Sequence, residues 1–348
     1  MRRRSLKRQK IFIIASSLSL LLFLTIGYAA FQTNITLSAK GNIKKTAEPI
    51  TIEQLREKVV TEGDGLYADS SEEGRYLYRG FNSNNKITFN NELWRIISIE
   101  SDGSLKIIKS ASTTATFNYD PGYPTVISGV TEKDSIVGTR YTNKDTDFCF
   151  HNTAETSYPG CNVWGSKTTM LNASGANVTS MPKEIGSSTT YNLPEKEAYI
   201  NTYLNETWYN SLNEESKNLV NNHTWDVGPI KSAADLTTTI QQASAYKWKG
   251  KVGLIQALDY VKANSNENCR TVSASSTNCG TNWLNGRYLL TMTAFSDSTS
   301  NNICRIDSFL QPVSSYSGLY IKPVIYLTPN ITLSGEGTDA SPYTITAQ

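Results

Sequence analysis

Few residues of this chain could carry out chemistry, and they do not form a catalytic pattern. The chain has two histidines, His151 and His223, and no Gly-x-Ser-x-Gly motif that would supply a nucleophile for them to activate. We therefore expect both histidines at the surface or at a helix end, and we predict no enzyme activity and no cofactor. The candidate carboxylates are scattered along the chain: Glu92, Asp226, Asp259, Asp297 and Asp307. If two of them converged in the fold, an extracellular hydrolase or modifying enzyme would be an alternative.

The five cysteines favour disulfides over a metal site. In an oxidising compartment such residues pair with one another. The simplest pairing joins Cys149 to Cys161 and Cys269 to Cys279, because each pair closes a short polar loop. In this pairing Cys304 is the odd cysteine. Spacing alone leaves the other pairings open. A zinc site built from the first two cysteines and both histidines is disfavoured, since the chain has no Cys-x-x-Cys pair, and we predict no bound metal.

The six tryptophans suggest a ligand-binding surface. Trp94 and Trp208 lie within apolar patterns, so we assign them to the core. Trp164, in "CNVWGS", and Trp248, in "AYKWKG", stand among polar residues and are the better candidates for exposed rings. An exposed indole can pack against the apolar face of a sugar. We therefore name Trp164 and Trp248 as candidate ligand-binding residues.

The N-terminus predicts export. Six of the 33 basic residues lie within the first ten positions, and an apolar run from Ile11 to Ile26 follows them. Gly27 and Ala29 have the small side chains of a signal-peptide cleavage site, which would release a chain that begins at Ala30. The same segment is also just long enough to anchor the chain in a membrane if it stays uncleaved. The remaining chain is mildly acidic, which disfavours nucleic acid as a partner.

A hairpin is the most clearly patterned part of the fold. The apolar segments at 92–99 and 104–110 flank Asp102-Gly103, a pair that favours a tight turn between strands. Both faces of the first segment carry apolar residues, which is typical of a strand between two packed layers. We expect this hairpin to be a framework, with any ligand site on the loops.

Other local patterns predict short helices and further strands. Thr51 and Gln54 have the spacing of a capping box, and Asn213 is placed to cap a helix that follows a helical patch at 194–212. A strand at 251–255 is expected to lead into a short helix, and more strands are expected after residue 280. Residues 111–190 are poor in apolar side chains and predict long surface loops.

These elements predict an α+β fold with mixed, mainly antiparallel sheets, a few short helices and long loops. We divide the chain into a signal peptide or membrane anchor at 1–30, a strand, linker and short helix at 31–74, and a disulfide-braced α+β extracellular domain at 75–348. The motif N-I-T-L-S occurs at 34–38 and again at 330–334. Two such strands could lie side by side and bring the ends of the chain together.

A series of motifs from Tyr78 onward resembles a family of uncharacterised exported proteins of gut-dwelling Gram-positive bacteria. The motifs are "YRG…NN…FNNELWRII", "FC…GCNVWGS", "YINTYLNETWYNSL", "GKVGLIQALDY…C…C…WL" and "IKPVIYL…SGEGT…PY". The resemblance implies family membership but no chemistry. Relatives usually have Arg where this chain has Lys322, and lysine does not reproduce the planar fork of arginine.

Two further resemblances bear on fold and export. The C-terminal half resembles domains with a C-type-lectin-like or sulfatase-modifying-factor-like α+β fold, although Cys269, Cys279 and Cys304 do not match the paired catalytic cysteines of the modifying enzymes. The stretch "GYAAFQTNITLSAKGNI" is similar to the signal-peptide junction of camelysin and TasA-like surface proteins.

Together, these features predict a cell-surface or secreted protein of the binding or adhesion type. Its expected partner is an extracellular glycan or protein ligand, with a membrane as a second partner if the N-terminal segment is retained. A subunit of a surface fibre or pilus-like assembly is the first alternative, and an extracellular hydrolase or modifying enzyme is the second.

Overall fold

The computed structural model divides the chain into two compact units, Met1–Thr46 and Ala47–Gln348. Within the first unit only residues 16–19 are described, and they are helical. The predicted signal peptide or anchor therefore lies almost entirely outside the described residues. None of the described helices is long and apolar enough to span a bilayer. The structure describes residues 16–19, 48–120, 162–182, 184–231, 234–270, 282–296, 302–307, 309–315 and 317–347.

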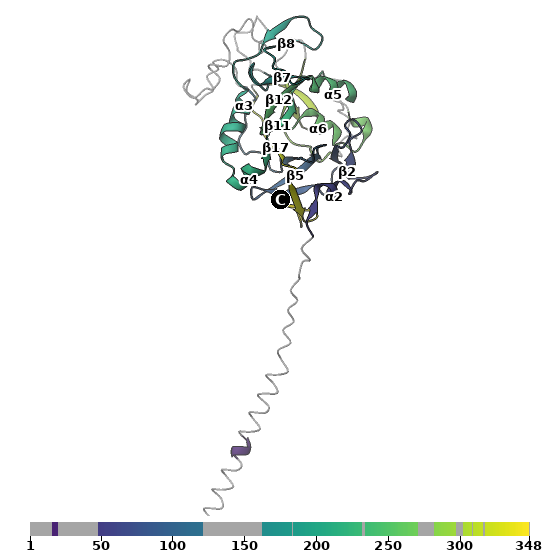
Figure 1. The fold of residues 1–348 in the computed structure, drawn as a ribbon, viewed down its shortest axis with the longest axis vertical. Coiled ribbons are helices and arrows are strands. Elements are labelled where there is room, and N and C mark those ends of the chain that lie inside the picture. Colours follow the sequence, from purple (N-terminus) through teal and green to yellow (C-terminus); the bar gives the residue numbers. More distant parts are fainter. Residues whose placement is uncertain are drawn as a thin grey trace, which may run out of the picture. The chain divides into compact units, whose positions relative to one another are not determined.

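The second unit is built on an eight-stranded sheet (Figure 1). Its main path runs β10-β17-β6-β5-β3-β2, with β13 also paired to β17 and β4 to β5, and every pairing is antiparallel. The strands are β2 (Gly65–Ala68), β3 (Tyr76–Arg79), β4 (Lys86–Phe89), β5 (Glu92–Ile99), β6 (Leu105–Lys109), β10 (Val220–Asn221), β13 (Val252–Gly253) and β17 (Val324–Leu327).

The predicted hairpin is confirmed as β5 and β6. The Asp102 carboxylate accepts a hydrogen bond from Ser104 N at 2.8 Å, and Gly103 turns the chain at φ 87°, a backbone conformation that favours glycine. Trp94 and Ile96 on β5 are fully buried, as is Ile107 on β6. The pair is therefore a central part of the core, as the apolar character of both faces predicts.

Four smaller sheets complete the strands. They are ordered β1-β18-β19, β11-β12-β7, β14-β15-β16 and β8-β9. Their strands are β1 (Ile50–Thr51), β7 (Met170–Asn172), β8 (Ser180–Pro182), β9 (Thr190–Asn192), β11 (His223–Asp226), β12 (Tyr246–Gly250), β14 (Leu289–Ala294), β15 (Asn302–Ile306), β16 (Leu310–Ser314), β18 (Ile331–Ser334) and β19 (Thr344–Ala347).

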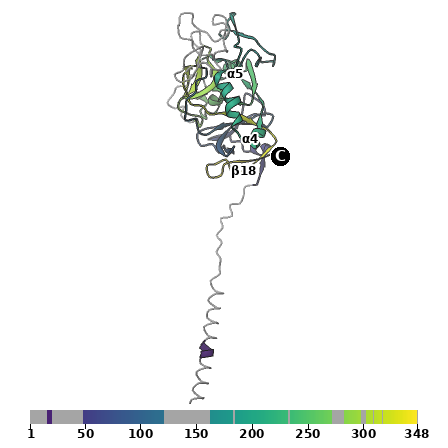
Figure 2. The same cartoon turned by 90° about the vertical axis from the view of Figure 1, so that its left-hand side faces the viewer.

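The two ends of the folded unit meet in the first of these small sheets. Strand β18 pairs with β1 on one side and with β19 on the other, so the first and last strands of the unit flank the same neighbour (Figure 2). The predicted partner of β18, the N-I-T-L-S copy at 34–38, lies outside the described residues.

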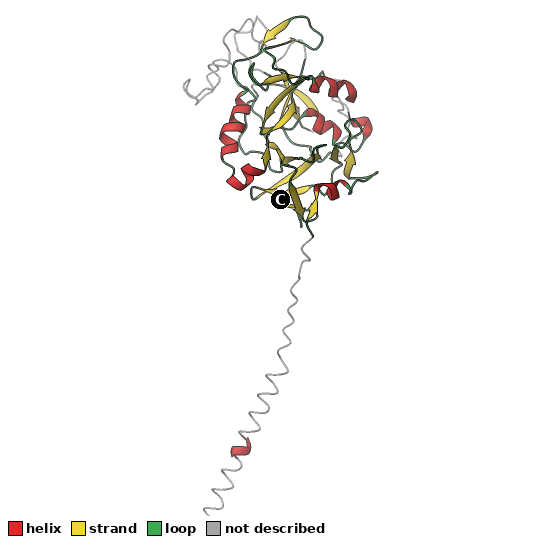
Figure 3. Ribbon diagram, in the orientation of Figure 1, coloured by secondary structure: helices red, strands yellow, loops and turns green. Residues whose placement is uncertain are grey.

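All the described helices are short, as predicted (Figure 3). Thr51 and Gln54 form the expected capping box, and Asn213 accepts a hydrogen bond from Ser216 N at 2.7 Å as the expected N-cap. In the view of Figure 1, α3 and α4 lie on one side of β11, β12 and β17, and α5 and α6 on the other. The described helices of the second unit are α2 (Ile52–Arg56), α3 (Tyr199–Thr202), η3 (Tyr203–Trp208), α4 (Glu214–Leu219), α5 (Leu236–Ser244), α6 (Ala257–Lys262) and η4 (Glu267–Cys269).

Two expectations about organisation differ from the structure. Residues 47–74 belong to the compact unit rather than to a separate linker segment, because β2 pairs with β3 and α2 buries Ile52 and Leu55. Where residues 111–190 are described they are not only surface loops, since Trp164, Met170 and Met181 are buried. The low average hydrophobicity of this stretch concealed a few large side chains that anchor it to the core.

Candidate functional site

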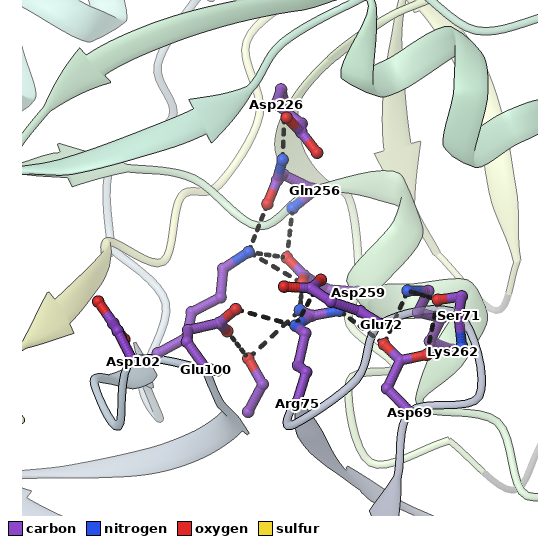
Figure 4. A network of polar contacts seen from close by, with 12 residues as sticks. Asp69, Ser71, Glu72, Arg75, Glu100, Asp102, Asp226, Gln256, Asp259 and Lys262 are labelled. Atoms are coloured by element: carbon purple, nitrogen blue, oxygen red, sulfur yellow. Dashed lines mark hydrogen bonds and ion pairs between the residues drawn. The ribbon is translucent and has the colours of Figure 1, made fainter. Parts of the chain in front are cut away.

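A network of buried charged residues joins the main sheet to helix α6 (Figure 4). Arg75, just before β3, lies at its centre. Its Nε is 2.9 Å from an oxygen of Glu100 and its Nη1 is 2.9 Å from an oxygen of Asp69. Its Nη2 is 3.8 Å from an oxygen of Asp259 on α6. Its Nε is also 3.8 Å from an oxygen of Glu72, so one guanidinium pairs with four carboxylates, two from the nearby segment at 69–72 and two from distant parts of the chain.

Lys106 is the most deeply buried cation of the network, with none of its surface exposed. Its Nζ is 2.7 Å from an oxygen of Asp259 and also donates a hydrogen bond to the side chain of Gln256. The ammonium lies 5.4 Å from the ring centroids of both Trp225 and Tyr326, a separation at which a cation is attracted to an aromatic face. Carboxylate, amide and rings together replace the water that Lys106 loses on burial.

A second ion pair extends the network to the start of the folded unit. Lys262, the last residue of α6, is 2.8 Å from an oxygen of Asp69, and its Nζ also donates to Ser71 Oγ at 2.7 Å. Burial alone would raise the pKa of Asp69, but the charge and hydrogen bond of Lys262, with help from Ser71 and Arg75, hold that pKa well below its usual value. Asp69 is therefore ionised at neutral pH.

The local sequence of α6 explains how the helix places Asp259 and Lys262 in the network. Gln256 N donates to Asp259 Oδ2 at 2.9 Å, so Asp259 holds the first turn of the helix while both of its oxygens accept hydrogen bonds from Lys106 Nζ. Asp259 and Lys262 are three residues apart and thus lie on the same side of the helix. The helix presents one acid and one base to the sheet.

Among the described residues, the network leaves no room for a substrate. Carboxylates do converge here, which is the condition under which a hydrolase would be considered, but each of Asp69, Glu100 and Asp259 is already paired with a cation. The adjoining cavity has a volume of about 10 Å³, roughly that of a single water site. Its lining includes Arg75, Asp259 and Lys262. We assign the network to structure rather than to catalysis.

A larger pocket lies between the β8–β9 hairpin and the C-terminal end of α5. Its volume is about 280 Å³, close to the lower end of the range of ligand pockets, ~300 Å³. Apolar side chains dominate the walls, and none of the lining residues that the structure describes is charged. These residues are Met181, Pro182, Ile185, Gly186, Pro229, Gln241, Gln242, Ala245 and Tyr246.

Close backbone packing positions the polar groups of this pocket. Gly228 N donates to Ala243 O at 2.9 Å, and a Cβ on Gly228 would lie only 2.2 Å from the carbonyl oxygen of Gln242, so a glycine is needed for Pro229 to approach α5. Gln242 Oε1 accepts a hydrogen bond from Lys231 N at 2.9 Å, which fixes its amide. Its Nε2 remains a donor that no described residue engages.

Tyr246 completes the polar side of the pocket. It is partly buried at the start of β12, and burial raises the pKa of its hydroxyl. The phenol is therefore neutral at physiological pH and can donate as well as accept a hydrogen bond. The pocket thus offers apolar walls, amide groups and one hydroxyl.

The two predicted ligand-binding tryptophans are not exposed. Trp164 and Trp248 are 1% and 4% exposed, and their rings contact each other edge to face at 5.8 Å. The expectation of an exposed aromatic platform at these residues is wrong for this structure. Trp248 is flanked by Lys247 and Lys249 on β12, and the alternation of a strand turns the indole inward while Lys249 faces solvent. Polar neighbours in the sequence therefore concealed a buried position.

The other predicted site residues are only partly described. Cys269 is buried and disulfide-bonded, but its expected partner Cys279 and the expected pair Cys149–Cys161 lie outside the described residues. Cys304 is a buried thiol in β15. The part of the chain that the structure describes contains no group of three or more His, Cys, Asp or Glu placed to hold a metal.

His223 and the candidate carboxylates have structural surroundings. His223 begins β11 and stacks on Tyr326 with ring centroids 3.6 Å apart, so it is neither a free surface residue nor a helix cap, and burial lowers its pKa. His151 and Asp297 lie outside the described residues. Of the carboxylates that are described, Glu92 pairs with Lys109 and Asp226 with Lys247, and Asp259 joins the buried network.

The pocket and most of the network were not predicted from the sequence. Helix α5, which forms one wall of the pocket, is capped at its N-terminus by Asp235, whose carboxylate accepts a hydrogen bond from Thr238 N at 2.7 Å. An Asp three residues before a Thr is a recognisable N-cap signal. For the network, the available signal was Lys106 within the apolar run "LKIIK".

Comparison of the chain with protein-family models, with curated proteins and with solved structures finds no match.

Proposed function

We propose that this chain is an exported binding protein that holds an uncharged glycan in the pocket between the β8–β9 hairpin and α5. The observation that carries the proposal is the chemistry of the lining. Apolar walls suit the carbon-bound faces of a sugar, and the amides of Gln241 and Gln242 with the hydroxyl of Tyr246 suit its hydroxyl groups. A charged ligand would have no counter-charge among these lining residues.

The distribution of charge also favours binding over acid–base catalysis. A general acid or base must reach the substrate, directly or through one water. The acids of the network are buried and paired with Arg75, Lys106 and Lys262, while the pocket with room for a ligand is lined by uncharged groups. We therefore place binding ahead of a hydrolase or modifying enzyme.

Export and a lectin-like architecture are part of the same proposal. The basic and apolar N-terminal segment and the resemblance to exported proteins of Gram-positive bacteria support export. The disulfide of Cys269 supports an oxidising compartment. The antiparallel sheets with short helices are compatible with a C-type-lectin-like or sulfatase-modifying-factor-like domain.

A glycan array with the purified chain tests the proposal. We expect neutral glycans to bind, and we expect Gln242→Ala and Tyr246→Ala to weaken that binding. Lys249→Ala is the matched control, because Lys249 lies on the same strand as Tyr246 but faces solvent. A complete absence of binding in every array format would refute the proposal, and so would binding that neither pocket variant changes.

A second candidate is a subunit of a surface fibre or pilus-like assembly. It is supported by β19, a C-terminal strand with largely exposed side chains that pairs along its length only with β18 among the described strands. An open strand edge can accept a strand from another molecule. Electron microscopy of the purified chain separates the two functions, because a subunit should polymerise and a binding module should stay monomeric.

A further inference from the structure

Arg95 is held in a fixed orientation on β5. Its guanidinium lies 4.3 Å from the ring centroid of Trp283, and its Nε donates to Asn85 Oδ1 at 2.8 Å. Asn85 is itself fully buried and fixed, because its Nδ2 donates to Ile96 O at 2.8 Å. The two terminal nitrogens of Arg95 have no acceptor in the described part of the chain. The stacking on Trp283 and the hydrogen bond to Asn85 therefore fix the guanidinium, so that its two terminal nitrogens form a preformed pair of donors.

Lys322 precedes β17, which lies two strands away from Arg95 in the main sheet. Arg95 on β5 faces Ile108 on β6, and Ile108 faces Val324 on β17, so these three residues form one row. Lys322 is two residues before Val324, in a segment that remains beside β6 because Lys109 N donates to Pro323 O at 3.0 Å. Lys322 is partly buried, and its ammonium contacts no acceptor within the described ranges.

A buried hydroxyl lies in the same region. Ser110 follows β6, and its N donates to Leu93 O at 3.1 Å, which places it between β5 and the segment that carries Lys322. Its Oγ is buried and has no hydrogen-bond partner among the described residues. A polar atom in this condition costs free energy unless a ligand or a water satisfies it.

The positive charges here exceed the negative ones. The nearby carboxylate is that of Asp339, which is paired with Lys86, the residue opposite Arg95 on β4, and is 80% exposed. Burial lowers the pKa of Arg95 to about 10, with only a partial opposing effect from Asp339. Burial, together with the charge of Arg95, lowers the pKa of Lys322. Neither group contacts a counter-charge among the described residues.

We propose that Arg95 and Lys322 form a binding site for an oxyanion, a carboxylate, sulfate or phosphate group carried by a ligand. The terminal nitrogens of Arg95 match two oxygens of such a group, and Lys322 adds a third charged donor. Trp283, itself buried, holds the Arg95 guanidinium in place for the anion. The site is separate from the uncharged pocket and does not depend on the function proposed for that pocket.

Isothermal titration calorimetry with sodium acetate, sulfate and phosphate tests this site, with sodium chloride keeping the ionic strength constant. We expect saturable binding of at least one oxyanion, and the ranking of the three salts identifies the preferred group. Lys322→Gln and Arg95→Gln should weaken binding by about tenfold or more, the loss expected for one charge-assisted hydrogen bond. Lys249→Gln, which removes an exposed lysine, is the matched control and should bind as the unchanged protein does.

Thermal unfolding without added oxyanion provides a second readout. Because Lys322 is repelled by Arg95, Lys322→Gln should melt at a higher temperature than the unchanged protein, whereas loss of a stabilising contact would lower that temperature. The oxyanion should raise the melting temperature of the unchanged protein and of Lys249→Gln by more than that of Lys322→Gln. The proposal is overturned if no oxyanion binds above the chloride background, or if Lys322→Gln binds as tightly as the control.

Discussion

Replacing Lys106 by Met should strongly destabilise the protein, because it breaks a buried ion pair on one side only. The Lys106 Nζ lies 2.7 Å from Asp259 with none of the lysine surface exposed. Loss of one partner of a buried pair costs about 3–5 kcal/mol of folding free energy. We expect the lower end, about 3 kcal/mol, because Asp259 keeps Arg75 at 3.8 Å and the backbone N–H of Gln256 at 2.9 Å.

Urea denaturation of four variants measures this loss. Lys106→Met and Asp259→Asn should each lower the free energy of unfolding, and the double variant should lose less than the sum, because it leaves no uncompensated charge at this pair. Methionine preserves the packing on Trp225 and Tyr326. Lys249→Met, at an exposed position, should change stability by less than about 0.5 kcal/mol. A loss below about 1 kcal/mol for Lys106→Met would refute the reasoning, since it would mean that water already reaches the pair.

Three further perturbations follow from the structure. Trp164→Ala should lower the free energy of unfolding by about 3–5 kcal/mol in urea, because it leaves a cavity in the core rather than removing a surface contact. Asp69 has a lowered pKa in the folded state, so it contributes stability that is fully present above its unfolded pKa of about 4 and is lost as the pH falls from there toward the folded-state pKa. Asp69→Asn should therefore flatten the fall in unfolding free energy between about pH 5 and pH 2. Gly228→Ala should lower the melting temperature and weaken binding of neutral glycans, because its Cβ would collide with the carbonyl oxygen of Gln242.

Local patterns predicted the elements whose signals are complete within a few residues. The β5–β6 hairpin was predictable because Asp102-Gly103 supplies both the side-chain acceptor and the left-handed backbone that the turn needs. The helix cap at Asn213 was predictable for a similar reason, since cap and first turn are adjacent in the sequence. The coarse class, antiparallel sheets with short helices, follows from several such signals together.

Sites that depend on distant contacts were not predictable in this way. Lys106 and Asp259 are 153 residues apart, and a single lysine in a strand ordinarily indicates a face in contact with water. The burial of Trp248 depends on β11 and β7 pairing on either side of β12, which its own neighbours do not indicate. The pocket likewise requires that the β8–β9 hairpin and α5, some 50 residues apart in the chain, lie together.

The meeting of β1 and β19 on either side of β18 has a practical consequence for experiments on this protein. These strands lie at one end of the folded unit, and β8, beside the pocket, lies at the other (Figure 1). An affinity tag appended after Gln348 would therefore emerge far from the pocket. Molecules captured on a sensor chip through such a tag would keep the pocket open to the analyte.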